Sequence, residues 1–238
     1  MKLMKFSGIF LSFCLLLSCD KNTASDMNTA PIVPSGTPLT YLALGDSYTI
    51  GEAVSVNESF PYQLAARLKT ANLNVQLPKI IAKTGWTTDE LQVAIKEAQI
   101  KTAFDMVTLL IGVNNQYRGY PQDTYRKEFK ALLQTAISFA GNNKKHVFVV
   151  SIPDWGVTPF GKNSGRDVQA IAQEIDAFNA INKEETLALG ISYTDITSGS
   201  RNALTDATLV AADGLHPSGK MYAEWALKVA GAVETNFK

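Results

Sequence analysis

The sequence predicts an α/β domain built on a five-stranded parallel sheet with helices on both faces. From residue 39 onward, five short apolar segments alternate with amphipathic segments, an order typical of β-α-β units. One of them, residues 106–112, is almost entirely apolar, as a strand buried on both faces should be. Parallel strands joined by right-handed crossovers all end at one edge of the sheet, and open α/β sheets bind their ligands there.

Five segments have the length and the apolar composition of strands. They span residues 39–45, 75–84, 106–112, 146–152 and 191–195. The first runs directly into Gly45-Asp46-Ser47 with no loop between. Its end therefore delivers a carboxyl group and a hydroxyl group to the edge of the sheet.

The segments between the strands repeat apolar residues at the spacing of amphipathic helices. A first helix covers about residues 59–69, and a second begins with the capping box Thr87-Thr88-Asp89-Glu90. A long helix over residues 125–140 is closed by Gly141, and another runs from Val168 toward Gly190. The last is predicted to begin at Pro217, because proline favours the first helical position.

The composition is that of one globular domain with a sizeable core, or of at most two small ones. The chain has 238 residues, of which 46% are hydrophobic and 18% are charged. Its 22 basic and 22 acidic residues cancel and form no basic cluster, which argues against nucleic acid as a partner. The only cysteines are Cys14 and Cys19, so the chain after them has no disulfide and no cysteine ligand for a metal.

The N-terminal segment has the features of an export signal. Lys2 and Lys5 precede an apolar run over residues 6–17, which is shorter than the roughly 20 residues that span a bilayer. The run ends in Leu16-Leu17-Ser18-Cys19, which resembles the lipobox of bacterial lipoproteins. That resemblance implies a signal peptide over residues 1–18, acylation of Cys19, a flexible tether up to residue 38 and an exported protein held at a membrane. The alternative is a plain signal peptide with an incidental cysteine.

Polar residues follow the predicted strands at several points of the chain. They are Gly45-Asp46-Ser47, Thr84-Gly85-Trp86, Gly112-Val113-Asn114-Asn115 and, before the last helix, Asp213-Gly214-Leu215-His216. A serine hydroxyl is a weak nucleophile until a base removes its proton, and histidine is suited to that task near neutral pH. Of the two histidines, His146 opens a strand at the opposite end, which leaves His216 as the base for Ser47.

The histidine also needs an acid that orients its ring and stabilises the imidazolium. Asp213, three residues earlier, can reach the ring locally, and Asp195 at the end of the fifth strand is the rival acid. If the last helix begins at Pro217, His216 lies at the positive end of its dipole, and Asp213 offsets that effect. The backbone amides of Ser47 and Gly85 and the side-chain amide of Asn114 could bind the oxyanion.

With these residues the chain resembles the SGNH (GDSL) hydrolase family, the lysophospholipase-like esterases. The resemblance covers residues 39–238 and has four blocks: GDSYT at 45–49, the glycine block around Gly85, GVNN at 112–115 and DGLHPS at 213–218. It implies a flavodoxin-like three-layer α/β/α sandwich with strand order 2-1-3-4-5. It also implies a triad of Ser47, Asp213 and His216, with an oxyanion hole of Ser47, Gly85 and Asn114. Many members have aspartate where this chain has Asn115.

Other residues near these blocks are candidates for the wall of a substrate cleft. They are Tyr48, Trp86, Tyr117, Arg118 and Trp155, with Phe160 in the segment after the fourth strand. Each could equally serve packing. Asp46 could brace the turn that carries Ser47.

The predicted protein is a lipid-anchored, monomeric carboxylic-ester hydrolase that uses an acyl-enzyme on Ser47 and needs neither metal nor cofactor. Short connections leave no room for a large lid, so a shallow cleft and small or extended substrates are expected. Short-chain esters, acetylated saccharides and lysophospholipids all fit. The alternatives are an acyltransferase of the same family and a non-catalytic surface lipoprotein that binds glycan.

Overall fold

The computed structural model describes Met1 and residues 36–237 of the chain. Residues 2–35 lie outside the described residues, and with them the predicted signal peptide after Met1, the predicted acylation site Cys19 and most of the predicted tether. They therefore stay predictions.

In the part of the chain that the structure describes, five parallel strands form the central sheet. They are β1 (Tyr41–Gly45), β2 (Lys79–Ala82), β3 (Met106–Leu110), β4 (Val147–Val150) and β5 (Ser192–Thr194). Their spatial order is β2-β1-β3-β4-β5, which confirms the predicted order. Gly45 lies opposite both Ala82 and Leu110, so the first three strands end level with one another at the same edge.

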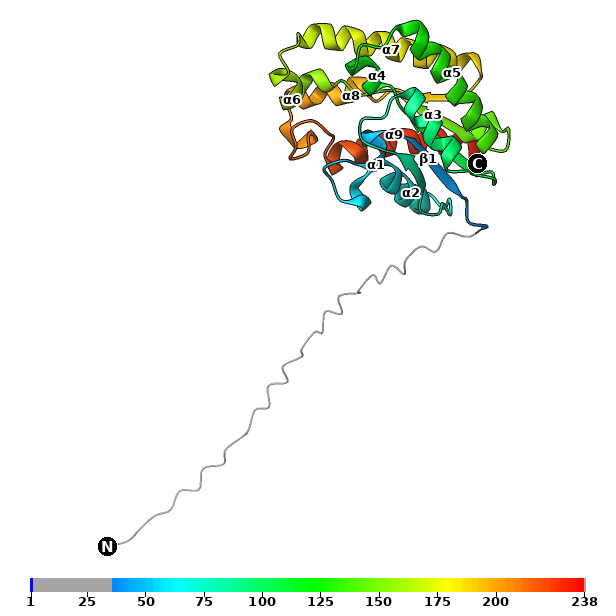
Figure 1. The fold of residues 1–238 in the computed structure, drawn as a ribbon. Coiled ribbons are helices and arrows are strands. Elements are labelled where there is room, and N and C mark those ends of the chain that lie inside the picture. The colour runs from blue at the N-terminus through cyan, green and yellow to red at the C-terminus, as the bar shows by residue number, and fades with distance from the viewer. Residues whose placement is uncertain (2–35, 238) are drawn as a thin grey trace. The chain divides into compact units, whose positions relative to one another are not determined.

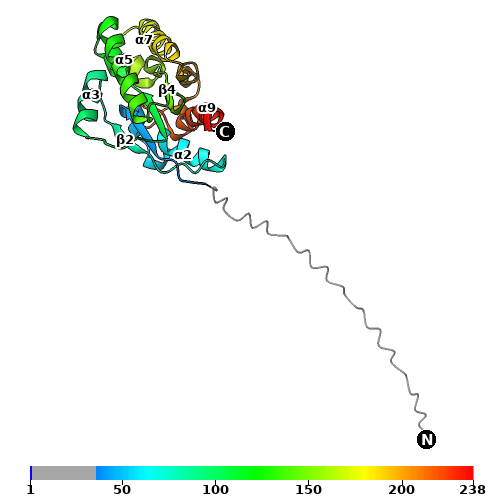
Figure 2. The same ribbon diagram turned by 90° about the vertical axis from the view of Figure 1, so that its right-hand side faces the viewer.

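Helices cover both faces of the sheet, as predicted. The long ones are α2 (Phe60–Thr70), α3 (Thr88–Glu97), α5 (Gln122–Phe139), α7 (Val168–Ala188) and α9 (Gly219–Phe237). The short ones are α1 (Ser47–Ile50), α4 (Val113–Tyr117), α6 (Pro159–Asn163) and α8 (Thr197–Ser200). The 3₁₀ turns among residues 36–237 are η1 (Val56–Glu58), η2 (Lys144–His146), η3 (Trp155–Val157), η4 (Arg201–Leu204) and η5 (Ala207–Leu209). Helix α2 packs against α9 on one face, while α5 packs against α3 and α7 on the other (Figures 1 and 2).

Several predicted element boundaries shift by two or more residues, and two of these shifts have a clear physical reason. The strand predicted over residues 75–84 is reduced to Lys79–Ala82, preceded by a single bridge between Leu39 and Val75. Pro78 lies between the two, and a proline has no N–H to donate to the ladder. The last helix begins at Gly219, not at Pro217, because Pro217 forms an isolated bridge with Val210.

The late start of α9 changes the expected surroundings of His216. The carbonyl of Ser218 accepts the hydrogen bond of Tyr222 N (3.0 Å), so Ser218 caps the helix and His216 lies two residues before the cap. The effect of a helix dipole falls off within the first turn. The predicted placement of His216 at the N-terminus of this helix is therefore wrong.

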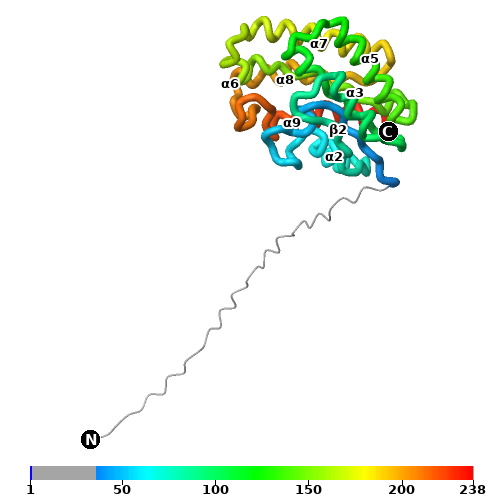
Figure 3. Tube along the Cα trace, in the orientation of Figure 1, coloured from blue at the N-terminus to red at the C-terminus, as the bar shows by residue number. Residues whose placement is uncertain are grey.

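The segment between α8 and α9 runs beside α6 (Figure 3). The amide of Phe160 in α6 donates to the carbonyl of Gly214 in this segment (2.9 Å). This bond ties the stretch that carries Asp213 and His216 to the chain that follows β4.

Candidate active site

Ser47 is held by a tight exit from strand β1 into the short helix α1. A β-carbon at Gly45 would lie 2.3 Å from the carbonyl oxygen of Leu110 and 2.1 Å from Thr49 Oγ1, so only glycine fits there. Asp46 caps α1, because its Oδ1 accepts a hydrogen bond from the amide of Tyr48 (3.0 Å). Ser47 is the first residue of α1 and is 4% exposed.

The capping carboxyl group of Asp46 is fully buried. Its second oxygen, Oδ2, has no hydrogen-bond partner among the described residues. Burial raises the pKa of Asp46 to about 7, against the opposing effect of the hydrogen bond from Tyr48. A substantial fraction of this side chain is therefore neutral at physiological pH.

His216 and Asp213 form a close pair. His216 Nδ1 lies 2.5 Å from Asp213 Oδ2, and Asp213 Oδ1 accepts the backbone amides of Leu215 (2.9 Å) and His216 (3.0 Å). Burial works to raise the pKa of Asp213, but the hydrogen bonds from the His216 ring and from the two amides outweigh it. The pKa of Asp213 lies below its ordinary value, so the carboxylate is charged at neutral pH.

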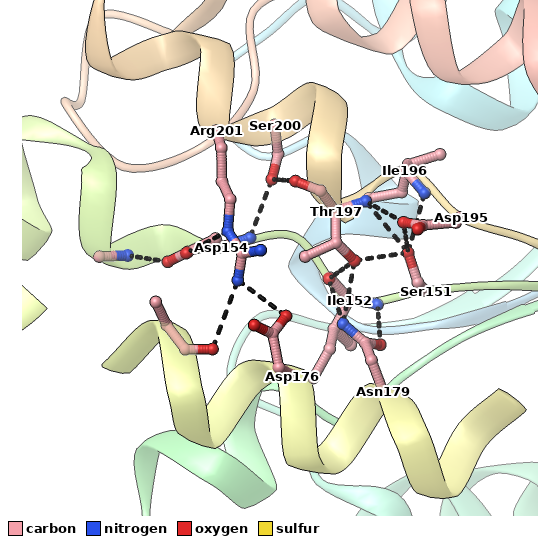
Figure 4. A network of polar contacts seen from close by, with 12 residues as sticks. Ser151, Ile152, Asp154, Asp176, Asn179, Asp195, Ile196, Thr197, Ser200 and Arg201 are labelled. Atoms are coloured by element: carbon pink, nitrogen blue, oxygen red, sulfur yellow. Dashed lines mark hydrogen bonds and ion pairs between the residues drawn. The ribbon is translucent and has the colours of Figure 1, made fainter. Parts of the chain in front are cut away.

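Asp195, the rival acid, is engaged elsewhere. Its Oδ1 accepts the amide of Thr197 (2.8 Å) and the hydroxyl of Ser151 (3.4 Å), as Figure 4 shows. Of the two candidate carboxylates, only that of Asp213 is hydrogen-bonded to His216 in the part of the chain that the structure describes.

Ser47 and His216 lie on one small cavity, which we call the inner cavity. It has a volume of about 180 Å³. Its lining consists of Ser47, Tyr48, Thr84, Gly85, Val113, Asn114, Tyr117, Trp155, Phe160, Leu215 and His216. At about 30 Å³ per water molecule, this volume corresponds to about six waters, enough for a small acyl group.

The three expected oxyanion donors come from residues on the inner cavity. The amide of Ser47 lies at the N-terminus of α1, where an N–H group has no partner within the helix. Gly85 has φ +86°, a left-handed conformation that favours glycine. Asn114 Nδ2 donates one hydrogen to the carbonyl of Trp86 (2.9 Å), which fixes the plane of its amide.

The candidate wall residues fall into two groups. Tyr48, Tyr117 and Trp155 line the inner cavity. The ring of Tyr48 lies 5.4 Å from that of His216, and the ring of Tyr117, which is 49% exposed, lies 5.3 Å from that of Trp155. Phe160, Thr84, Val113 and Leu215 line the cavity too. Thr84, Val113 and Leu215 were not predicted as wall residues, because only their position next to the motif residues could have indicated them.

Trp86 and Arg118 lie beside the inner cavity without lining it. The carbonyl of Trp86 holds the Asn114 amide, while Arg118 Nη2 donates to the carbonyl of Gly85 (2.6 Å) and Nη1 pairs with Glu90 (3.1 Å). Both residues thus position the backbone or the side chain of an expected oxyanion donor.

Trp155 is held in the cavity wall by a buried polar network. Asp154 Oδ1 accepts the amide of Gly156 (2.9 Å), its Oδ2 pairs with Arg201 Nε (2.8 Å), and its amide donates to Ser200 Oγ (2.9 Å). Arg201 also reaches Asp176 (2.8 Å), as Figure 4 shows. The network joins the turn after β4 to η4, with Asp154 and Arg201 47 residues apart in the sequence.

Two further features of the described residues concern metal sites and membrane-spanning helices. Within residues 36–237, no group of three or more histidine, cysteine, aspartate or glutamate side chains is arranged to hold a metal ion. No helix in that part of the chain is both long and apolar enough to cross a membrane.

Comparisons with known proteins identify relatives of this chain. A family model described as the GDSL-like lipase/acylhydrolase family matches residues 43–224. A search of curated proteins found no significant match.

Several solved structures share the fold. The lipase Lip_vut3 from a goat rumen metagenome has a TM-score of 0.66 and 20% identity, with 82% of this chain and 97% of that chain covered. The lipase/acylhydrolase from Enterococcus faecalis has a TM-score of 0.62 and 18% identity, covering 84% and 97%. A mutant of Axe2, an acetyl-xylooligosaccharide esterase from Geobacillus stearmophilus, has a TM-score of 0.62 and 18% identity, covering 87% and 98%.

Proposed function

Because the chain belongs to the GDSL-like lipase/acylhydrolase family and is a carboxylic-ester hydrolase, we propose that it cleaves esters of short acyl chains through an acyl-enzyme on Ser47. One observation carries the proposal. Ser47 and His216 line the same inner cavity, and the ring of His216 is held 2.5 Å from the charged carboxylate of Asp213.

The chemistry follows from this arrangement. His216 Nε2 takes the proton of Ser47 Oγ as that oxygen attacks the ester carbonyl carbon, while Asp213 accepts the Nδ1 hydrogen and stabilises the imidazolium. The amides of Ser47 and Gly85 and Asn114 Nδ2 donate to the oxyanion. Collapse breaks the bond to the alcohol oxygen, which leaves with the proton from His216. A water molecule then attacks the acyl-enzyme by the same steps and releases the acid.

The inner cavity favours a short acyl chain. Its volume of about 180 Å³ and its aromatic walls suit an acetyl or butyryl group. The acyl chain of a lysophospholipid would have to extend beyond it. The alcohol part of the ester, which leaves first, is therefore expected outside the inner cavity.

The test is hydrolysis of p-nitrophenyl acetate, butyrate and octanoate by the purified protein and its Ser47→Ala variant. We expect activity that falls from butyrate to octanoate and is lost in the variant. Ser138→Ala, at an exposed position of α5, is the matched control. Labelling of Ser47 by a fluorophosphonate probe would locate the nucleophile. Unchanged hydrolysis by the Ser47→Ala variant would contradict the proposal.

We also propose that the protein is an exported lipoprotein anchored through Cys19. Support comes from Lys2 and Lys5, the apolar run 6–17 and the sequence Leu16-Leu17-Ser18-Cys19. Cys19→Ser should move the protein from the detergent phase to the aqueous phase of a Triton X-114 extraction, and Cys14→Ser should not. Partitioning of the Cys19→Ser variant into detergent would exclude the anchor.

A further inference from the structure

A second, wider hollow adjoins the inner cavity and has no part in the proposed chemistry. This outer groove has a volume of about 610 Å³, within the range of roughly 300–1,000 Å³ typical of ligand sites. Its lining includes Gln116, Tyr117, Arg118, Tyr120, Arg166 and Glu174. Tyr117 lines both spaces, so a ligand in the outer groove lies next to the mouth of the inner cavity.

The charges of the outer groove are already paired. Arg166 Nη2 lies 2.6 Å from Glu174 Oε2, and Arg118 Nη1 lies 3.1 Å from Glu90 Oε1. An anionic headgroup would have to compete with these carboxylates for the guanidinium groups. A neutral ligand rich in hydroxyl groups would instead find donors and acceptors side by side, together with the rings of Tyr117 and Tyr120.

The wall between the two spaces is a connected set of side chains. Trp155 Nε1 donates to Gln116 Oε1 (2.8 Å), and Gln116 Nε2 donates to Glu174 Oε2 (2.6 Å). Arg166 binds the same Glu174 oxygen and lies over the Trp155 ring, 5.5 Å from its centroid. The groups that face the outer groove therefore also fix Trp155, a wall of the inner cavity.

We propose that the outer groove binds the sugar ring of an acylated saccharide, the alcohol part of the ester, while the acyl group enters the inner cavity. This inference rests on the proposed hydrolase function for its catalytic consequence. It assigns the specificity for the alcohol to Tyr120 and its neighbours. Sugar rings pack their C–H faces on aromatic rings, so Tyr120 contributes to binding more through its ring than through its hydroxyl group.

The experiment compares two acetyl esters that differ in the presence of a ring. Methyl β-glucoside tetraacetate has one, and glycerol triacetate has none. We expect Tyr120→Ala to lower the ratio of their kcat/KM values about tenfold, mainly through KM for the glucoside. Tyr120→Phe keeps the aromatic ring and should keep the ratio. Tyr62→Ala, a tyrosine of α2 that lines neither space, is the matched control.

Binding of free cellobiose, followed by saturation-transfer NMR, tests the outer groove without catalysis. Binding to the wild-type protein that is lost in Tyr120→Ala supports the inference, even if no ester is hydrolysed and the proposed function fails. Absence of cellobiose binding, an unchanged ratio in Tyr120→Ala, or a preference for the anionic ester lysophosphatidylglycerol would each overturn the inference. In these three cases, loss of p-nitrophenyl acetate hydrolysis in Ser47→Ala would leave the proposed function intact.

Discussion

Replacing Asp46 by asparagine should change how the stability of the protein depends on pH. The carboxyl group is fully buried beside Ser47, with one oxygen bound to the amide of Tyr48 and the other without a partner. Asparagine keeps the shape and the accepting oxygen. It removes the ionisation and adds an NH2 group that does not titrate, so the pH-dependent part of the difference isolates the charge.

The magnitude follows from the pKa values. Burial raises the pKa of Asp46 from 3.8 to about 7 in the folded protein. Between these values the unfolded chain has lost the proton and the folded protein retains it, so the free energy of unfolding falls as pH rises. Over this interval of about three pH units the wild-type protein loses about 4 kcal/mol, and above pH 7 the loss is complete. The Asp46→Asn variant does not lose this free energy, because asparagine does not ionise.

The assay is urea unfolding of both proteins, followed by circular dichroism at several pH values from about 4 to about 8. The free energy of unfolding of Asp46→Asn minus that of the wild type should rise steadily and then level off near pH 7. Asp206→Asn is the control. Hydrogen bonds from Lys220 and Thr208 lower the pKa of Asp206 from 3.8 to about 2, so its contribution to stability is complete above about pH 4 and is lost between these two values. The difference in free energy of unfolding between Asp206→Asn and the wild type should therefore stay constant across the range tested.

Two outcomes would refute this reasoning. A constant difference between wild type and Asp46→Asn would mean that burial does not raise the pKa of Asp46. A difference that falls with rising pH would mean that the folded protein prefers the carboxylate, stabilised by the amides at the start of α1.

Three further substitutions test the site and its support. Asn114→Ala should lower kcat for p-nitrophenyl acetate by about 10²–10³ with a smaller change in KM; a loss confined to KM would place Asn114 in substrate binding instead. Asp213→Asn should lower kcat by about 10⁴ in the same assay, because the ring of His216 loses its orienting acceptor; a change below tenfold would contradict this role. Arg201→Met should lower the free energy of unfolding in urea by about 3 kcal/mol, because it leaves the buried carboxyl group of Asp154 without its charged partner. The control Arg67→Met, at an exposed position of α2, should lower it little. Equal losses in the two variants would argue against a stabilising role for the network.

The sheet and the neighbourhood of Ser47 could be predicted because they depend on local patterns. Apolar runs predict strands, parallel strands end at one edge, and the polar residues that follow them must meet there. Gly85, Asn114 and His216 indeed lie with Ser47 on the inner cavity. Their catalytic roles remain predictions, to be tested by the substitutions above.

What could not be predicted depends on contacts between residues far apart in the sequence. The pairing of Asp154 with Arg201 has no local signature, although it holds the turn that presents Trp155. The start of α9 was misplaced because a bridge from Val210 holds Pro217 in extended chain. Neighbours of a motif can also lie beside the inner cavity without lining it, as Arg118 does when its Nη2 donates to the carbonyl of Gly85.

Asn115 stands where many family members have aspartate. Its side-chain oxygen and its side-chain NH2 group both have hydrogen-bond partners on Thr88. Asn115 is fully buried; its Oδ1 accepts the amide of Thr88 (3.1 Å), and its Nδ2 donates to Thr88 Oγ1 (2.7 Å). The single hydroxyl hydrogen of Thr88 is donated to Glu128. An aspartate at position 115 would bring a second carboxyl oxygen to that hydroxyl with no hydrogen left to share.

Asn115→Asp should therefore cost at least about 2 kcal/mol in the free energy of unfolding at neutral pH, because one buried acceptor is left unsatisfied and the new carboxyl group is itself buried. Adding Glu128→Gln should recover the hydrogen-bond part of this loss, since the Gln amide lets Thr88 Oγ1 accept a hydrogen and donate its own to position 115. Glu128→Gln alone should change stability little, because its amide oxygen still accepts from Thr88. A double-mutant cycle in urea measures the coupling. Additive effects, or a stable Asn115→Asp single variant, would show that the pair does not explain the departure.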